Sequence, residues 1–142
     1  MRRSATLVLL LAATLGAHAL AAPLRQNHPI VGTWQFTLPD GSCREVYRMH
    51  DDGTSIVTSA QEVAESSFEI ADQPDEQGFY KQTDTIVRDN GKHDCGGEVT
   101  KVGHMVTSYI LFHPGGNMFV SCIERDTRRC IGPFVRMKGA DT

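Results

Sequence analysis

The segment N-G-K-H-D-C-G-G-E, residues 90–98, concentrates side chains that could do chemistry. His93, Asp94 and Cys95 stand in a row, and glycines lie on both sides of them. A cysteine two residues from a histidine could form a thiolate–imidazolium pair, and both side chain types are also zinc ligands. The segment therefore has three interpretations: a reactive thiol, a metal site, or a polar turn that carries a structural cysteine.

The metal interpretation needs more ligands than this segment supplies. Structural zinc sites take four ligands, usually from closely paired spacings such as C-x2-C or H-x3-H. Neither spacing occurs in the chain, and the other candidate histidines, His50, His104 and His113, are isolated from one another in the sequence. We therefore expect no metal centre and no cofactor.

The beginning of the chain resembles a secretory signal peptide. Arg2 and Arg3 form a short positive region, and the uncharged run after them is too short to span a bilayer. We expect cleavage after Ala19 or Ala21, so that residues 22–142 form one domain. The predicted location is the periplasm or the extracellular medium, and we expect no membrane span.

All four cysteines lie after the predicted signal peptide: Cys43, Cys95, Cys122 and Cys130. In an oxidising compartment an even number of cysteines indicates disulfides, and four cysteines allow three pairings. Cys122 and Cys130 flank a polar segment between two strand-like runs, where a bridge would close the neck of a hairpin. We therefore expect that bridge and a Cys43–Cys95 bridge, with the other pairings still open. A cysteine in a disulfide is neither a nucleophile nor a zinc ligand, so residues 90–98 would then form a turn.

Other catalytic groups have weak support. No G-x-S-x-G motif presents a serine nucleophile. Paired acids occur at residues 51–52 and 75–76, but both pairs lie in turns rich in glycine or proline, where solvated acids are common. We expect no catalytic residues and interpret the protein as non-enzymatic, with a thiol- or metal-dependent enzyme as a remoter alternative.

The chain after the signal peptide consists of short strand-like runs between turn residues. The one helix-like stretch is A-Q-E-V-A-E-S-S, residues 60–67. Turns are expected at Asp51-Asp52-Gly53, where glycine permits a positive φ, and at Asn90-Gly91. The expected strands cover residues 30–38, 43–50, 54–59, 67–71, 79–89, 98–102, 105–113, 118–124 and 130–137.

Eight or nine short strands with hairpin-length connections predict an all-β fold. An antiparallel up-and-down β-barrel of about eight strands fits best because closure removes the sheet edges, and a β-sandwich is the alternative. The alternation of the first strand places Trp34 and Phe36 on one face, and that of the second places Tyr47 and Met49 on one face. We expect these faces to point inward, with Trp34 and Phe36 in the core.

Two short motifs resemble the lipocalin-like (calycin) pattern. Gly32-Thr33-Trp34 forms a G-x-W strand, and residues 47–54 form an aromatic-x-apolar strand that turns at D-G-T. In that family the tryptophan packs across the base of the barrel, often beneath an arginine from the last strand, and the resemblance implies this role for Arg136. The chain as a whole also resembles uncharacterised exported bacterial proteins of the same length, which implies no function.

A small barrel with inward aromatic and methionine side chains could hold one apolar or amphipathic molecule at its mouth. The candidate ligand contacts are Tyr47, Met49, Phe68, Tyr109 and Phe112. Alternatively these side chains fill the barrel, and the protein is a module that binds an envelope protein, as an inhibitor or accessory, through the charged loops 72–78 and 124–129. The sequence does not indicate an oligomeric state.

The charge of the chain argues against nucleic acid as a partner. The chain has 14 Lys and Arg against 17 Asp and Glu, a net charge of −3. Loss of Arg2 and Arg3 with the signal peptide would make this −5, because 12 positive side chains would remain. No basic stripe is left to bind phosphates or an anionic membrane surface.

Overall fold

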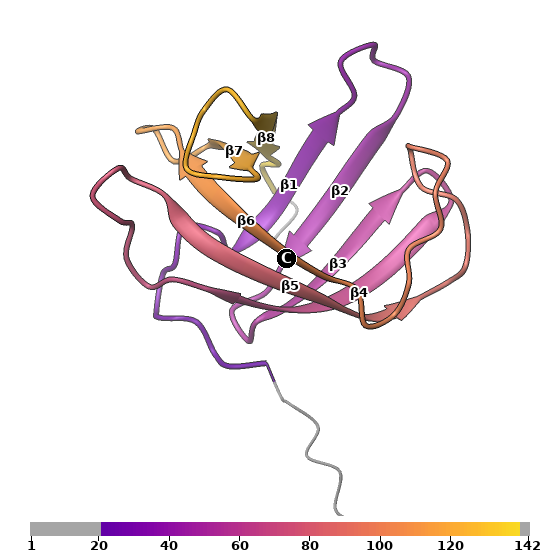
Figure 1. The fold of residues 1–142 in the computed structure, drawn as a ribbon, viewed down its shortest axis with the longest axis horizontal. Helices are drawn as coiled ribbons and strands as arrows, with labels where there is room; N and C mark the ends of the chain where they lie inside the picture. The colour runs from indigo at the N-terminus through magenta and orange to yellow at the C-terminus, as the bar shows by residue number, and fades with distance from the viewer. Residues whose placement is uncertain (1–20, 140–142) are drawn as a thin grey trace, which may run out of the picture.

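The computed structural model describes residues 21–139 as a closed antiparallel barrel in which each strand pairs with the next and the last pairs with the first (Figure 1). The barrel, not the sandwich, is therefore the fold, and no helix occurs among the described residues. The predicted signal peptide lies outside these residues apart from Ala21. The strands are β1 (Gly32–Thr37), β2 (Arg44–Met49), β3 (Thr54–Ser59), β4 (Glu62–Ile70), β5 (Tyr80–Asp89), β6 (Met105–Phe112), β7 (Met118–Cys122) and β8 (Cys130–Arg136).

Two local predictions are wrong. Residues 60–67 are not helical: Ala60 adopts a positive φ of 52° in a tight turn, and β4 starts at Glu62. The small and acidic residues of this stretch alternate between the two faces of a strand, a period of two that their helix-like composition conceals. Residues 98–102 form no strand either. The backbone N–H of Asp94 donates to the Glu98 carbonyl and the backbone N–H of Glu98 donates to the Asp94 carboxylate, and these two bonds hold the segment in the loop 90–104.

The predicted turn between β2 and β3 is present and requires its glycine. Gly53 has a φ of 79°, and a Cβ atom there would lie 2.6 Å from the carbonyl oxygen of Ala22. Both facts exclude a larger residue. The backbone N–H of Phe68 donates to the Gly53 carbonyl at 2.8 Å, so this turn also anchors β4.

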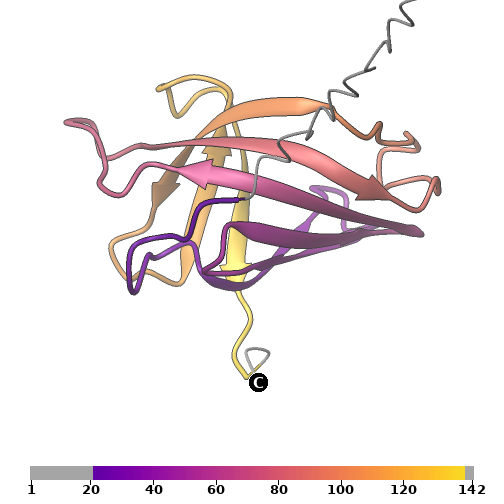
Figure 2. The ribbon, with the colours of Figure 1, turned by 90° about the horizontal axis from the view of Figure 1, so that it is seen from below.

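The alternating strand directions define two ends of the barrel. Loops 38–43, 60–61, 90–104 and 123–129 gather at one end, which we call the open end. The N-terminal segment 24–31 and loops 50–53, 71–79 and 113–117 gather at the other, the closed end. In Figure 2, β8 runs steeply across the direction of the long strands β4–β6 before it returns to β1.

Aromatic side chains fill the closed end. Trp34 is fully buried and meets the Phe119 ring edge-on at 4.7 Å between centroids. Phe119 stacks on Phe134 at 4.6 Å, and Phe134 stacks on Phe36 at 5.1 Å. These rings interlock, and together with Ile30, Met49 and Ile110 they form the hydrophobic core.

Arg136 covers this core from the last strand. Its guanidinium lies 4.1 Å from the centre of the Trp34 ring and donates to the carbonyls of Val31 at 2.8 Å and Pro29 at 2.7 Å. The Trp34 indole N–H donates to the Ile30 carbonyl at 2.8 Å. Since β1 and β8 pair only at Trp34–Arg136 and Gln35–Val135, these side-chain contacts carry much of the barrel's closure.

His28 completes the closed end as a neutral imidazole. It is buried, its Nδ1 accepts from the backbone N–H of Ile30 at 3.2 Å, and its Nε2 donates to the Ala71 carbonyl at 3.0 Å. Burial lowers the pKa of His28, because a protonated ring would lose the Ile30 bond and carry an unsolvated charge.

The two predicted disulfides are confirmed, and both lie at the open end. Cys43 and Cys95 join the start of β2 to the loop 90–104, with their Cα atoms 5.8 Å apart. Cys122 and Cys130 are register partners of β7 and β8, with their Cα atoms 3.9 Å apart. The described residues contain no free cysteine.

Replacing Arg136 with methionine should lower the free energy of unfolding by about 3 kcal/mol, through loss of two charge-assisted hydrogen bonds and the ring contact. Urea unfolding followed by Trp34 fluorescence measures this. The matched control is Arg48→Met, at an exposed position of β2, which should change stability by less than about 0.5 kcal/mol. Equal losses in the two variants would contradict the role of Arg136 in closure.

The two disulfides should contribute different amounts to the free energy of unfolding. In the chain-entropy model a loop of 52 residues is worth about 4 kcal/mol and one of 8 residues about 2.5 kcal/mol. Cys43→Ser/Cys95→Ser should therefore unfold at lower urea concentration than Cys122→Ser/Cys130→Ser. The reverse order would contradict the ranking that loop length gives.

Candidate functional site

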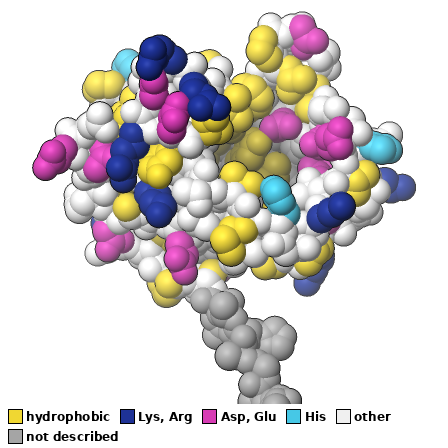
Figure 3. Space-filling model, in the orientation of Figure 1, with side chains coloured by type: hydrophobic (Ala, Val, Ile, Leu, Met, Phe, Trp, Pro, Cys, Tyr) yellow, Lys and Arg dark blue, Asp and Glu magenta, His cyan; other side chains and the backbone are white. Residues whose placement is uncertain are grey.

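The barrel interior is hollow toward the open end. A cavity of about 280 Å³ lies there, and Figure 3 shows it as a hollow with hydrophobic side chains in its floor and acidic side chains beside it. Val106 and Ile131, which line it, are 46% and 55% exposed, so the cavity opens to solvent. The apolar lining consists of Ile30, Met49, Val57, Ile86, Val106, Ile110, Phe119, Ile131 and Phe134.

The polar lining consists mostly of hydroxyl groups and contains one charged residue. The hydroxyls of Ser55 and Ser66 bond to each other at 2.7 Å, so they satisfy one another inside the barrel. The polar residues that line the cavity are Tyr47, Ser55, Ser66, Gln82, Asp84, Ser108 and Ser121. The wall can therefore contact an apolar body and also bond polar groups of a ligand.

Asp84 is the charged residue of the lining. It points inward from β5, and its Oδ2 accepts from Nε2 of Gln82 at 2.7 Å. Burial raises the pKa of Asp84 to about 6, and the hydrogen bond from Gln82 offsets only part of this effect. The carboxyl group is therefore ionised at neutral pH in a poorly solvated place.

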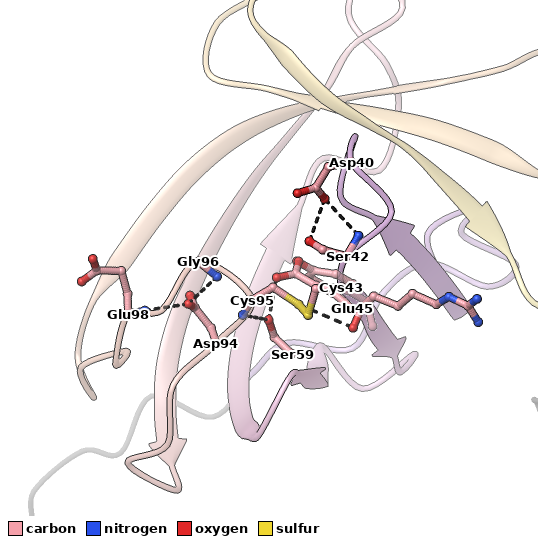
Figure 4. Close-up of a disulfide and its surroundings, with 11 residues drawn as sticks. Asp40, Ser42, Cys43, Glu45, Ser59, Asp94, Cys95, Gly96 and Glu98 are labelled. Carbon is pink, nitrogen blue, oxygen red and sulfur yellow. Dashed lines mark hydrogen bonds between the residues drawn. A yellow bond between two sulfur atoms is a disulfide. The ribbon is translucent and has the colours of Figure 1, made fainter.

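A chain of hydrogen bonds ties the Cys43–Cys95 disulfide to the cavity wall. The backbone N–H of Cys95 donates to the Ser59 hydroxyl at 2.9 Å, and that hydroxyl donates to Oε1 of Glu45 at 2.6 Å (Figure 4). Tyr47 donates to Oε2 of the same carboxylate at 2.5 Å. Burial and the Glu45 charge raise the pKa of Tyr47, so its hydroxyl stays protonated and its ring stays fixed in the wall.

An acidic pair, Glu62 and Asp89, lies inside the open end. Glu62 on β4 is buried, and burial raises the pKa of its carboxyl. The neighbouring Asp89 carboxyl on β5 raises this pKa further. One oxygen of each carboxyl, Oε1 of Glu62 and Oδ2 of Asp89, is buried without a hydrogen-bond partner. The interpretation of residues 60–67 as helical missed Glu62, because only a strand aims it into the barrel.

The predicted ligand contacts fall into three places. Tyr47 and Met49 line the cavity. Phe68 and Phe112 point inward but belong to the closed end, where Phe112 packs 6.0 Å from Trp34 between ring centres. Tyr109 lies on the outer face of β6, where the Arg125 guanidinium covers its ring at 5.1 Å.

Strand alternation could have identified the cavity residues that sequence reasoning missed. Ser108 and Ile110 point inward on either side of Tyr109. Strict alternation along β6 therefore predicts that the Tyr109 side chain points outward. The same count along β5 places Gln82, Asp84 and Ile86 in the barrel. Their chemical significance depends on the neighbours that closure brings to them.

The segment His93-Asp94-Cys95 is a structural loop. Asp94 Oδ1 accepts from the backbone N–H of Gly96 and of Glu98, both at 2.8 Å (Figure 4). His93 is exposed and its Nδ1 bonds to the Gly97 carbonyl at 2.9 Å, while Cys95 is in a disulfide. Within residues 21–139, no group of three or more His, Cys, Asp or Glu side chains is arranged to hold a metal ion.

Comparisons with protein-family models, with curated proteins and with solved structures give no match. The part of the chain that the structure describes contains no helix that is long and apolar enough to cross a membrane.

Replacing Asp84 with asparagine should raise the free energy of unfolding at pH 7.5 by about 2 kcal/mol. The folded-state pKa lies above the usual value of 3.8, so the wild-type protein loses stability as pH rises from about 4 to about 6. At pH 4 the folded-state carboxyl is protonated while the unfolded one, with its usual pKa of 3.8, is only about half ionised, so the gain from the variant should shrink to about 0.5 kcal/mol. Urea unfolding at pH 4 and pH 7.5 measures the difference.

The control for this measurement is Asp51→Asn, at an exposed turn position. That variant should have the same stability as the wild type at both pH values, within about 0.5 kcal/mol. A loss of stability in Asp84→Asn at pH 7.5 would mean that the Asp84 charge is well solvated.

Proposed function

We propose that the protein binds one small apolar or amphipathic molecule in the cavity at the open end, as an exported, non-enzymatic, lipocalin-like protein. The observation that carries the proposal is the cavity of about 280 Å³ beside a solid core. It is about twice the ~150 Å³ cavity that holds benzene, so a ligand of about 10–15 non-hydrogen atoms fits its volume.

The division of the barrel into two halves supports this proposal. The aromatic rings and Arg136 close one end, so a ligand can enter only from the other. The cavity wall mixes methyl groups and rings with hydroxyl groups, as ligand pockets usually do. The resemblance of Trp34 and Arg136 to the calycin pattern also favours a barrel of this kind.

The disulfides support export. Two disulfides are typical of proteins in oxidising compartments, and both bridges hold the open end, where packing is least complete. We infer a periplasmic or extracellular location from these bridges together with the signal-like start of the chain.

A second candidate function, binding of an envelope protein, has one observation in its favour. β6 pairs with β7 only from Tyr109 onward, so its Met105–Ser108 segment lies outside that ladder. Met105, Val106, Ile123 and Ile131 are exposed around it, at 63%, 46%, 61% and 55%. An extended partner segment could add to this edge. We prefer the small ligand because the same rim opens directly into the cavity.

Binding of 3-methylindole, a neutral aromatic probe of 10 non-hydrogen atoms, tests the proposed function. We expect a dissociation constant on the order of 0.1 mM, about 0.5 kcal/mol for each atom. Chemical-shift perturbation in NMR spectra should centre on Ile110 and Phe134. Ser108→Phe should weaken binding at least about tenfold, since its ring would fill the cavity.

The matched control is Thr107→Phe, which adds the same ring to the exposed face of the same strand. It should leave the affinity unchanged. Near-ultraviolet circular dichroism shows whether each variant keeps the aromatic core. Shifts confined to Met105 and Ile123, which do not line the cavity, would instead favour the exposed edge of β6, and no binding to the wild type would contradict the proposal.

A further inference from the structure

The cavity wall carries a negative charge and no positive one. Asp84 is the only charged residue among those that line the cavity, and no lysine, arginine or histidine accompanies it. The ion pairs of the described residues, Arg88–Glu65, Arg125–Asp75, Arg128–Asp126 and Arg129–Glu124, leave Asp84 out. Its charge therefore has no protein counter-ion in the cavity.

Asp84 also differs from the other inward acids. Glu45 accepts hydrogen bonds from two hydroxyls, those of Ser59 and Tyr47. Glu62 lies beside Asp89, and the cavity lining includes neither of them. Asp84 accepts a single hydrogen bond, from Gln82, within the described part of the chain. Of these carboxylates, Asp84 is the one that both lines the cavity and has acceptor capacity left for a ligand.

Gln82 gives an independent sign of a missing donor. The residue is only 6% exposed, it lines the cavity, and its Oε1 is buried without a hydrogen-bond partner. Its amide orientation is fixed, because the Asp84 carboxylate can only accept and so must face the NH₂ group. A buried carbonyl oxygen without a donor costs free energy that a ligand donor would recover.

Ser108 stands beside these two residues. It is the register partner of Gln82 across the β5–β6 ladder, and it also lines the cavity. Among the described residues, none forms a hydrogen bond with the Ser108 hydroxyl, so this hydroxyl can bond to a ligand. Asp84, Gln82 and Ser108 thus lie in one stretch of the cavity lining, and their carboxylate, amide oxygen and hydroxyl can all accept hydrogen bonds.

We propose that the ligand is an amphipathic organic cation, a primary amine whose ammonium group donates to Asp84 and to Gln82 Oε1 while its apolar body lies against Ile110, Phe119 and Phe134. This inference rests on the proposed ligand-binding function and specifies its substrate class. An ammonium group has three N–H donors and one positive charge. These match the three acceptors Asp84, Gln82 Oε1 and Ser108, of which Asp84 carries the negative charge. A bare metal ion fits less well, because the carboxylate has no second acidic or histidine ligand in the lining.

Three indoles with the same ring test the charge preference: tryptamine, 3-methylindole and indole-3-propionate, which are a cation, a neutral molecule and an anion at pH 7.5. Isothermal titration calorimetry measures the three dissociation constants. The buffer contains 150 mM salt, which screens the effect of the net surface charge on binding. Tryptamine should bind at least about tenfold more tightly than 3-methylindole, as a charge-assisted hydrogen bond implies. Indole-3-propionate should bind more weakly than either.

Two cavity variants and one surface control test whether the preference arises in the cavity. In Asp84→Asn the tryptamine advantage should fall to within about twofold, while the affinity for 3-methylindole should stay the same. Glu69→Gln removes an exposed acid from β4, outside the cavity lining, and should keep the full advantage. In Gln82→Leu the advantage should fall severalfold because one acceptor is lost.

The outcomes separate this inference from the function on which it rests. If 3-methylindole binds the wild type but tryptamine binds no better, the amine specificity is wrong and the ligand-binding function stands. If the tryptamine advantage survives in Asp84→Asn, the surface charge and not the cavity explains it, and the inference is also overturned. If no indole binds the wild type, the proposed function itself fails.

Discussion

The contact between Arg136 and Trp34 is the constraint on which the barrel depends. The last strand meets the first at two register pairs, and one of these is the Trp34–Arg136 pair itself. Arg136 adds to that short ladder by lying over the indole and by donating to two carbonyls of the segment before β1. The cation is thus almost fully paired at the seam. Without it, β8 would present an edge along the barrel, and the Trp34 ring would lose its cover.

This closure determines how each half of the barrel is stabilised. The closed end packs rings against rings, so hydrophobic burial supplies its stability. The open end encloses a cavity, and two disulfides and the hydrogen-bond chain from Cys95 through Ser59 and Glu45 to Tyr47 hold its wall. Covalent and polar constraints thus stand where packing is absent, and they keep the cavity from collapsing.

The features that repeat along the chain were predictable, and those that depend on closure were not. Alternation and turn residues predicted the strands, the barrel and the hairpin bridge Cys122–Cys130, because each follows from neighbours in sequence. The helix prediction for residues 60–67 was wrong because their composition favours a helix, while pairing with β3 and β5 makes them a strand. The site needs partners from strands far apart in sequence. Asp84 is an ordinary strand acid until β6, β7 and β8 surround it with apolar side chains.

The interior acids explain why stability and binding should be opposed in this barrel. A carboxylate in a cavity lined by Ile110 and Phe134 loses hydration that no protein cation replaces, so it destabilises the empty fold. An apolar or amide side chain there would make a more stable barrel. A bound cation would supply the missing charge and hydrogen bonds, and it would stabilise the native state increasingly as its concentration rises above the dissociation constant. The free energy that Asp84 removes from folding is then the free energy that a cationic ligand of the proposed kind would recover on binding.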